Sequence, residues 1–177
     1  MNHSTKTLSL LAKHSHTSAL ALQEAVEHPC RLCVSQISEW NRQTLSELSD
    51  AERLYSSLPP AERPLLAIAY RLADCVHRAF FAAMLLPEEL PRLPPLLEVA
   101  ACNSLLAQHA LTQLQSRTAD CFSMHLCANK GRGAHAVLLA SYCTTEGGRA
   151  LLPLALALEA HRNALERACE EILLHLP

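Results

Sequence analysis

The chain has 177 residues, of which 50% are hydrophobic and 18% are charged, and its formal net charge is −2. This composition is too apolar for a disordered protein, and the length is typical of one domain, so we expect a single helical domain over 1–177. Sheet proteins need β-branched and aromatic residues and glycine turns, whereas this chain has 4% aromatic residues and 4 glycines. The sequence therefore predicts an all-α bundle of about six or seven helices.

Charge and hydropathy narrow the classes of partner. The 15 basic and 17 acidic residues form no basic stripe, so we expect no nucleic-acid partner. The longest uncharged run, 99–116, contains too many amide side chains for a membrane span. The apolar patch at 8–12 is followed at once by Lys13 and His14, which is not typical of a secretory signal. We therefore expect a cytoplasmic protein without membrane insertion, whose 8 cysteines are thiols.

The first half of the chain predicts three helices. Apolar residues at helical spacing predict a first helix over 4–27, which Pro29 ends. A weaker stripe follows, and the capping-box pattern from Ser49 to Glu52 predicts a break near Ser49. The third helix, at about 61–86, is apolar around most of its girth, as expected for a central helix.

A proline-rich segment, 87–95, separates the two halves and allows a weak two-unit organisation, 1–86 and 96–177. In the first half His16 lies 17 residues before Cys33, and in the second half His109 lies 18 residues before Cys127. Each half also contains a His-Arg pair, beginning at His77 and at His161. The distances from cysteine to His-Arg pair are 44 and 34 residues, so this symmetry is faint enough to be a coincidence.

The second half predicts a helix that ends near Arg117, a short helix over 118–129 and two further helices. The 4 glycines all lie between 131 and 148 and bracket a helix at 134–145, which we expect to be mobile. The last helix, at about 150–175, has heptad spacing with His161 in its seam, which predicts a long partner helix. That partner belongs either to the same chain or to a second copy, so a homo-oligomer through 151–175 stays open.

Two clusters have the local spacing that a zinc ion requires. Ligands on one helix need i,i+3 or i,i+4 spacing, and the clusters that pass are His28, Cys30 and Cys33, and Cys121, His125 and Cys127. A zinc or other transition-metal site would have to join both clusters. The competing interpretation, which we favour, is that these cysteines act as small hydrophobic residues in the core and bind no cofactor.

A third pattern suggests an anion site. Lys130 and Arg132 flank Gly131 at a predicted helix N-terminus, where backbone N–H groups and two cations would suit a phosphate. Such a pattern more often forms a solvent-exposed turn. No motif of nucleophilic or metal-dependent catalysis is present.

The primary hypothesis is therefore a non-enzymatic protein that acts by contact with another protein, as an adaptor, regulator or inhibitor. The residues expected to form its hydrophobic groove lie on the helix at 134–145 and are Val137, Leu138, Leu139 and Tyr142. The alternatives are a zinc-binding bundle that uses the two clusters, and an enzyme or binder of a small anionic ligand at Lys130 and Arg132.

Overall fold

The structure is a computed structural model, and it describes residues 3–29, 31–56, 64–116, 121–144 and 148–175. Helices contain 93% of these residues and none of them is in a strand, so the predicted all-α class is confirmed. The elements are α1 (His3–Glu27), α2 (Arg31–Ser56), α3 (Pro64–Met84), α4 (Pro94–Ser116), α5 (Cys121–Thr144), the short 3₁₀ helix η2 (Gly148–Leu151) and α6 (Leu152–His175). Among the described residues, none of the helices combines the length and the hydropathy of a membrane span.

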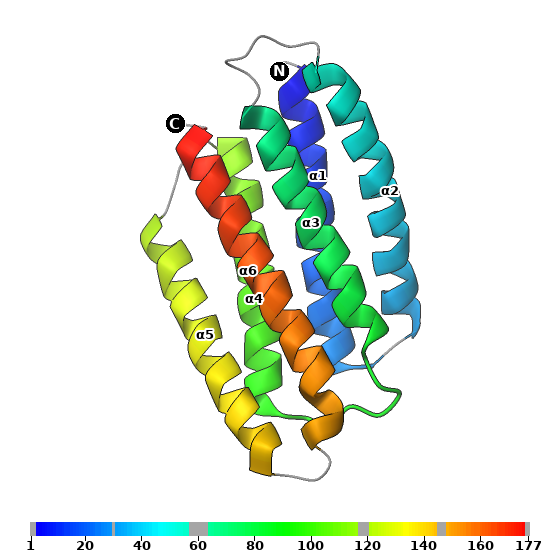
Figure 1. The fold of residues 1–177 in the computed structure, drawn as a ribbon, viewed down its shortest axis with the longest axis vertical. Coiled ribbons are helices and arrows are strands. Elements are labelled where there is room, and N and C mark those ends of the chain that lie inside the picture. Colours follow the sequence, from blue (N-terminus) through cyan, green and yellow to red (C-terminus); the bar gives the residue numbers. More distant parts are fainter. Residues whose placement is uncertain (1–2, 30, 57–63, 117–120, 145–147, 176–177) are drawn as a thin grey trace.

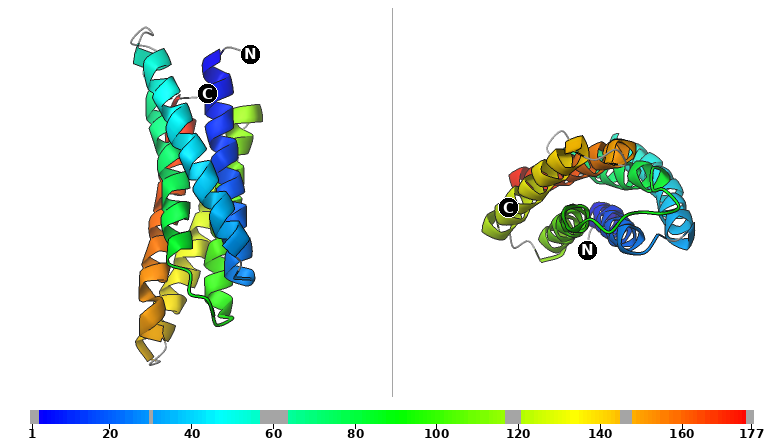
Figure 2. Two further views of the ribbon diagram at one scale, coloured as in Figure 1. Left: turned by 90° about the vertical axis from the view of Figure 1, so that its right-hand side faces the viewer. Right: turned by 90° about the horizontal axis from the view of Figure 1, so that it is seen from below.

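The helices form two layers (Figure 1 and Figure 2). Seen along the bundle, α2, α3, α6 and α5 form a curved outer layer, and α1 and α4 lie side by side on its concave side. The two central contacts are α3 on α6 and α1 on α4, and in both pairs the helices run in opposite directions. The helices α2 and α5 lie at opposite ends of the outer layer.

The six helices fall into two similar units, α1–α3 and α4–α6. Within each unit the second helix packs on the first and the third, and the units meet through α1 on α4 and α3 on α6. Adding 88 to the residue number takes every buried position of α1 except Ala21 to a buried position of α4. The buried α1 positions that match in this way are Leu8, Leu11, Ala12, His14, Ser15, Ser18, Ala19, Leu22, Ala25 and Val26.

The other two helix pairs match as well. An offset of 87 takes the buried Ile37, Thr44 and Ala51 of α2 onto the buried Met124, Gly131 and Leu138 of α5. An offset of 89 takes most buried positions of α3 onto buried positions of α6.

A contact between helices confirms this register independently. In the first unit His14 of α1 meets Thr44 of α2, with 3.2 Å between Nδ1 and Oγ1. The equivalent positions in the second unit are Cys102 and Gly131, and they are also neighbours: a Cβ on Gly131 would lie 3.2 Å from the Cys102 Cβ. The two units are therefore an internal repeat. The His-Arg pairs that begin at His77 and at His161 do not occupy equivalent positions in this repeat, since His77 is exposed and His161 is buried.

Two predicted breaks are wrong. The capping-box pattern at Ser49 lies inside the continuous helix α2, because Ala51 is fully buried and continues the buried row of Ile37 and Thr44. The glycines at 131 and 133 lie inside the continuous helix α5, so the predicted break between separate helices at 118–129 and 134–145 does not exist. In both places packing against a neighbouring helix overrides the local signal.

The two helices singled out in the sequence both pack within the chain. The helix α3 begins at Pro64, has nine buried residues and contacts three helices, and its apolar Tyr70 and Met84 are 46% and 61% exposed. The heptad seam of α6, including Leu158, is buried mainly against α3 and α4. The seam residues from Leu151 to Ile172 are therefore buried within the chain, whereas His175 at the end of the seam is exposed.

Candidate binding groove between α4 and α5

The two cysteine clusters do not come together. Cys33 is buried near the start of α2, whereas Cys121 and His125 lie on α5, at the other end of the outer layer. The His125 ring contacts its own helix, with 2.7 Å between Nδ1 and the Cys121 carbonyl oxygen. Among the described residues, the bundle therefore does not bring the two clusters together, because α2 and α5 lie at opposite ends of the outer layer. Cys30 lies outside the described residues.

The remaining side chains do not form a metal cluster elsewhere in the part of the chain that the structure describes. No group of three His, Cys, Asp or Glu residues there has ligand geometry.

The premise of the anion site is also not met. Lys130 and Arg132 lie in the middle of α5, where backbone N–H groups are used within the helix, and not at a helix N-terminus. Both cations already have partners: Lys130 Nζ lies 3.1 Å from Glu98 Oε1, and Arg132 Nη1 lies 2.6 Å from Glu166 Oε2.

The four residues expected to line a groove on 134–145 are divided between core and surface. Leu138 and Tyr142 are buried in the core, and Leu139 is partly buried against it. Val137 points outward with 54% of its surface exposed. They do not form one groove, because the leucine and tyrosine side chains pack on the inner face of α5, toward the core.

The structure does contain a groove on another face of α5. It is a cavity of about 300 Å³ between α4 and α5. Its rim carries two exposed leucines, Leu105 at 49% and Leu126 at 59%, and Phe122, at 78% exposure, lies one turn before Leu126 on α5. The lining residues are Glu98, Ala101, Cys102, Leu105, His109, Ser123, Leu126, Cys127 and Lys130.

A pair of cysteines lines the inner part of this groove. Cys127 Sγ lies 3.3 Å from the carbonyl oxygen of Cys102, within reach of a hydrogen bond between α5 and α4. A hydrogen bond from the Cys127 side chain, together with nearby positive charge from Lys130 and Arg162, lowers the pKa of Cys102 to about 7. The same side-chain hydrogen bond with Cys102 raises the pKa of Cys127, and burial and the neighbouring Cys102 thiolate raise it further.

Behind the cysteine pair, a charged layer holds α5 on α6. The Arg162 side chain is 4% exposed and lies between two carboxylates, 3.5 Å from Glu159 and 3.2 Å from Glu166. His135 of α5 also approaches Glu159, at 3.2 Å. Room for the arginine comes from Gly131, since a Cβ there would lie 3.3 Å from the Arg162 Cδ. These charges are paired with one another inside the bundle, which is typical of a structural role.

A neutral histidine completes the polar contacts of α6. Asn103 Nδ2 donates to the carbonyl oxygen of Leu158 at 3.0 Å and lies 3.3 Å from Nδ1 of His161. Complete burial lowers the pKa of His161 to about 3, so its ring is uncharged at neutral pH.

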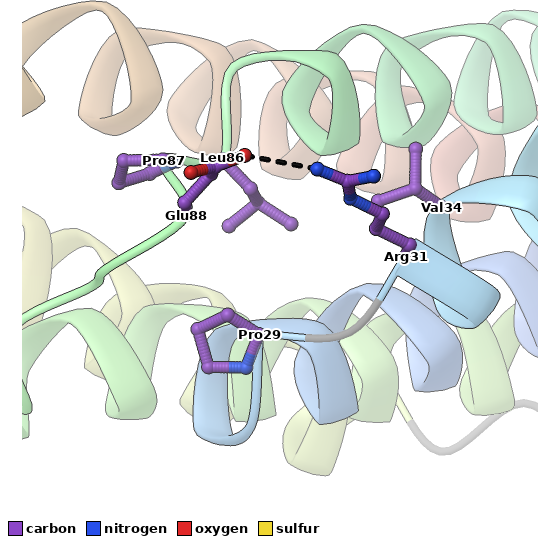
Figure 3. Close-up of a pocket in the computed structure, with 6 residues that line it drawn as sticks. All are labelled: Pro29, Arg31, Val34, Leu86, Pro87 and Glu88. Atoms are coloured by element: carbon purple, nitrogen blue, oxygen red, sulfur yellow. Dashed lines mark hydrogen bonds and ion pairs between the residues drawn. The ribbon is translucent and has the colours of Figure 1, made fainter.

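A second cavity, of about 430 Å³, lies at one end of the bundle (Figure 3). It opens between the α1–α2 turn and the α3–α4 connection. Its polar feature is the ion pair of Arg31 with Glu88, at 3.0 Å, and both side chains are almost fully exposed. An exposed pair of this kind contributes little binding energy, so the α4–α5 groove is the stronger candidate site.

Comparison of the chain with models of known protein families gave no match, and no curated protein is significantly similar to it. The function must therefore be argued from the geometry of the groove.

Proposed function

We propose that this protein acts by binding another protein through the groove between α4 and α5, without catalysing a reaction. The observation that carries the proposal is the internal repeat, because it shows which surface residues the fold itself requires. The three exposed apolar side chains of the groove face are Leu105, Phe122 and Leu126. The equivalent positions of the first unit are Thr17, Ser35 and Glu39.

These differences between the two units occur at equivalent positions on equivalent helices. A polar residue therefore suits the fold at each of them, and the apolar character of the second unit serves something other than folding. A cluster of exposed apolar residues beside a cavity is typical of a contact surface. Full burial of one such side chain contributes about 1.5–3 kcal/mol, so three of them are enough to anchor a partner.

Site-specific photocrosslinking in cells tests the proposal. A photoreactive phenylalanine analogue is placed at Phe122, in the groove face, and in a second variant at Leu45, which is 56% exposed on the first unit. We expect a covalent adduct with another protein from position 122 and none of the same mass from position 45.

Two matched substitutions then establish dependence on the groove. Leu126→Glu should abolish the adduct at position 122, because it places a charge in the apolar contact. Leu45→Glu, at a leucine of nearly equal exposure, should leave the adduct unchanged. An adduct that survives Leu126→Glu, or one that proves to be a second copy of this chain, contradicts the proposal.

A further inference from the structure

The cavity between α4 and α5 lies at the position of the second unit that is equivalent to Trp40 of the first unit. The offset of 87 that takes Ile37 onto Met124 and Thr44 onto Gly131 also takes Trp40 onto Cys127. Cys127 lines the cavity between α4 and α5. The second unit therefore has a small thiol at the position where the first unit has the largest side chain.

The environment of Trp40 shows what its ring does in the first unit. Trp40 is partly buried and packs against the core cluster that includes Ala21 and Leu22 of α1. The α4 position equivalent to Ala21 is His109, which lines the cavity. The first unit thus has an aromatic ring, packed against the core, at the position that in the second unit lines an open cavity.

We propose that the α4–α5 cavity receives an aromatic side chain of the partner protein, which takes the place that Trp40 takes in the first unit. This inference rests on the proposed function and names the group that the groove recognises. A volume of about 300 Å³ is at the lower end of the range of ligand pockets and suits one large side chain. Tryptophan and tyrosine are also the residues that dominate contact energies between proteins.

The chemistry of the lining fits an uncharged ring. Glu98 and Lys130 lie on the rim and neutralise each other at a distance of 3.1 Å. They offer no net charge to a charged guest, while a carboxylate oxygen of Glu98 can accept from an indole N–H. Cys102 and Cys127 are among the residues that line the cavity, and sulfur makes favourable contacts with aromatic rings.

The binding of a neutral indole probe tests the inference directly. N-acetyl-tryptophanamide is added at millimolar concentration, and alkylation of Cys102 and Cys127 by iodoacetamide is followed by mass spectrometry. We expect the probe to slow alkylation of both thiols at least threefold relative to N-acetyl-leucinamide, and to leave alkylation of the exposed Cys121 unchanged. Equal rates with the two probes would overturn the inference.

A substitution that reproduces the first unit provides the matched test. Cys127→Trp should fill the cavity, keep the helical circular dichroism and remove both the probe effect on Cys102 and the adduct at position 122. Cys127→Ser, which leaves the cavity open, should retain the adduct and the protection of Cys102. If Cys127→Trp does not fold, Ala101→Trp fills the same cavity from α4 and carries the same expectation.

The inference and the proposed function fail in different ways. An adduct that depends on Leu126 but survives a filled cavity overturns the aromatic guest and leaves protein binding in place. Protection by the indole probe without any adduct at position 122 overturns protein binding and, with it, the assignment of the ring to a partner.

Discussion

At the scale of single residues, the Cys102 thiol is unusual because it is buried and yet more acidic than an ordinary cysteine. Its pKa is lowered to about 7 because the Cys127 side chain donates a hydrogen bond and Lys130 and Arg162 are close. Since the thiolate is the nucleophile, the reactivity of Cys102 depends on contacts between three helices, and it reports on the integrity of the groove.

The first prediction follows from that thiol. The alkylation rate of Cys102 should rise with pH through a midpoint near 7 and then level, because the thiolate is fully formed above its pKa. Removal of the donor in Cys127→Ala should raise the midpoint toward the ordinary thiol value. The measurement is the rate of iodoacetamide labelling at that site by mass spectrometry, from pH 5.5 to 9. An unchanged midpoint in Cys127→Ala contradicts the role of the hydrogen bond.

The second prediction concerns His161, whose folded pKa of about 3 lies below the ordinary value of 6.5. Below pH 6.5 the imidazole of His161 is protonated in the unfolded chain, whereas in the folded chain it stays neutral down to about pH 3. The free energy of unfolding should therefore fall by about 1.4 kcal/mol per pH unit through this window from His161 alone.

The repeat supplies the variant that tests this pH dependence. The first unit has Leu72 at the position of His161, so His161→Leu should fold and lose that part of the slope in urea denaturation between pH 6 and 4. The exposed His77→Leu is the control and should keep the slope. Equal slopes in wild type and His161→Leu would show that this histidine is not buried in its neutral form.

At the scale of helices, the two glycines of α5 have opposite surroundings. A Cβ at Gly131 would lie 3.2 Å from Cys102 Cβ and 3.3 Å from the buried Arg162, whereas a Cβ at Gly133 meets nothing within 4 Å. The first glycine therefore permits the close approach of α5 to α4 and α6. The second only weakens the helix.

The third prediction is a matched pair of substitutions. Gly133→Ala should stabilise the protein by about 0.5–1 kcal/mol, because alanine is the better helix former and the site is open. Gly131→Ala should destabilise it by about 1–2 kcal/mol, because α5 must move away from its neighbours. Urea denaturation of both variants provides the comparison. A stabilised Gly131→Ala would show that the contact can relax without cost.

The sequence predicts those helices whose buried faces are regular. The stripes of α1, α3 and α6 follow from apolar spacing alone, since the residues that pack against them do not alter the pattern. The continuity of α2 and α5 does not follow, because the pattern at Ser49 and the glycine at 131 are local signals that contacts with other helices override.

The groove was missed for a related reason. Cys102 and Cys127 are 25 residues apart in the sequence, and their proximity exists only once α5 lies on α4. The signal that could have found the site was the similar order of buried positions in the two halves, which becomes visible at offsets of 87–89 residues and not through matched histidines.

At the scale of the whole molecule, the two units share their core. One core cluster contains Leu72 of the first unit together with Leu106 and Leu165 of the second. Neither unit buries these faces alone, so we expect the two units to unfold together and not as independent domains.

The fourth prediction follows from that shared core. A protease site inserted between the exposed residues Pro91 and Arg92 should allow cleavage, and the two fragments should stay together on size exclusion. Each fragment expressed alone should lack a cooperative thermal transition by circular dichroism, and mixing should restore it. A fragment that unfolds cooperatively by itself contradicts the dependence on the shared core.

The exchange of tryptophan for cysteine between the two units also bears on how such a chain can evolve. Trp40 packs against the core in one half, whereas the equivalent Cys127 lines a cavity in the other. On the proposed function, the lining of that cavity is selected for recognition and the surroundings of Trp40 are selected for packing. Natural variation should therefore be tolerated unequally across the molecule, with the positions around Cys127 following the partner and the positions around Trp40 held by the core.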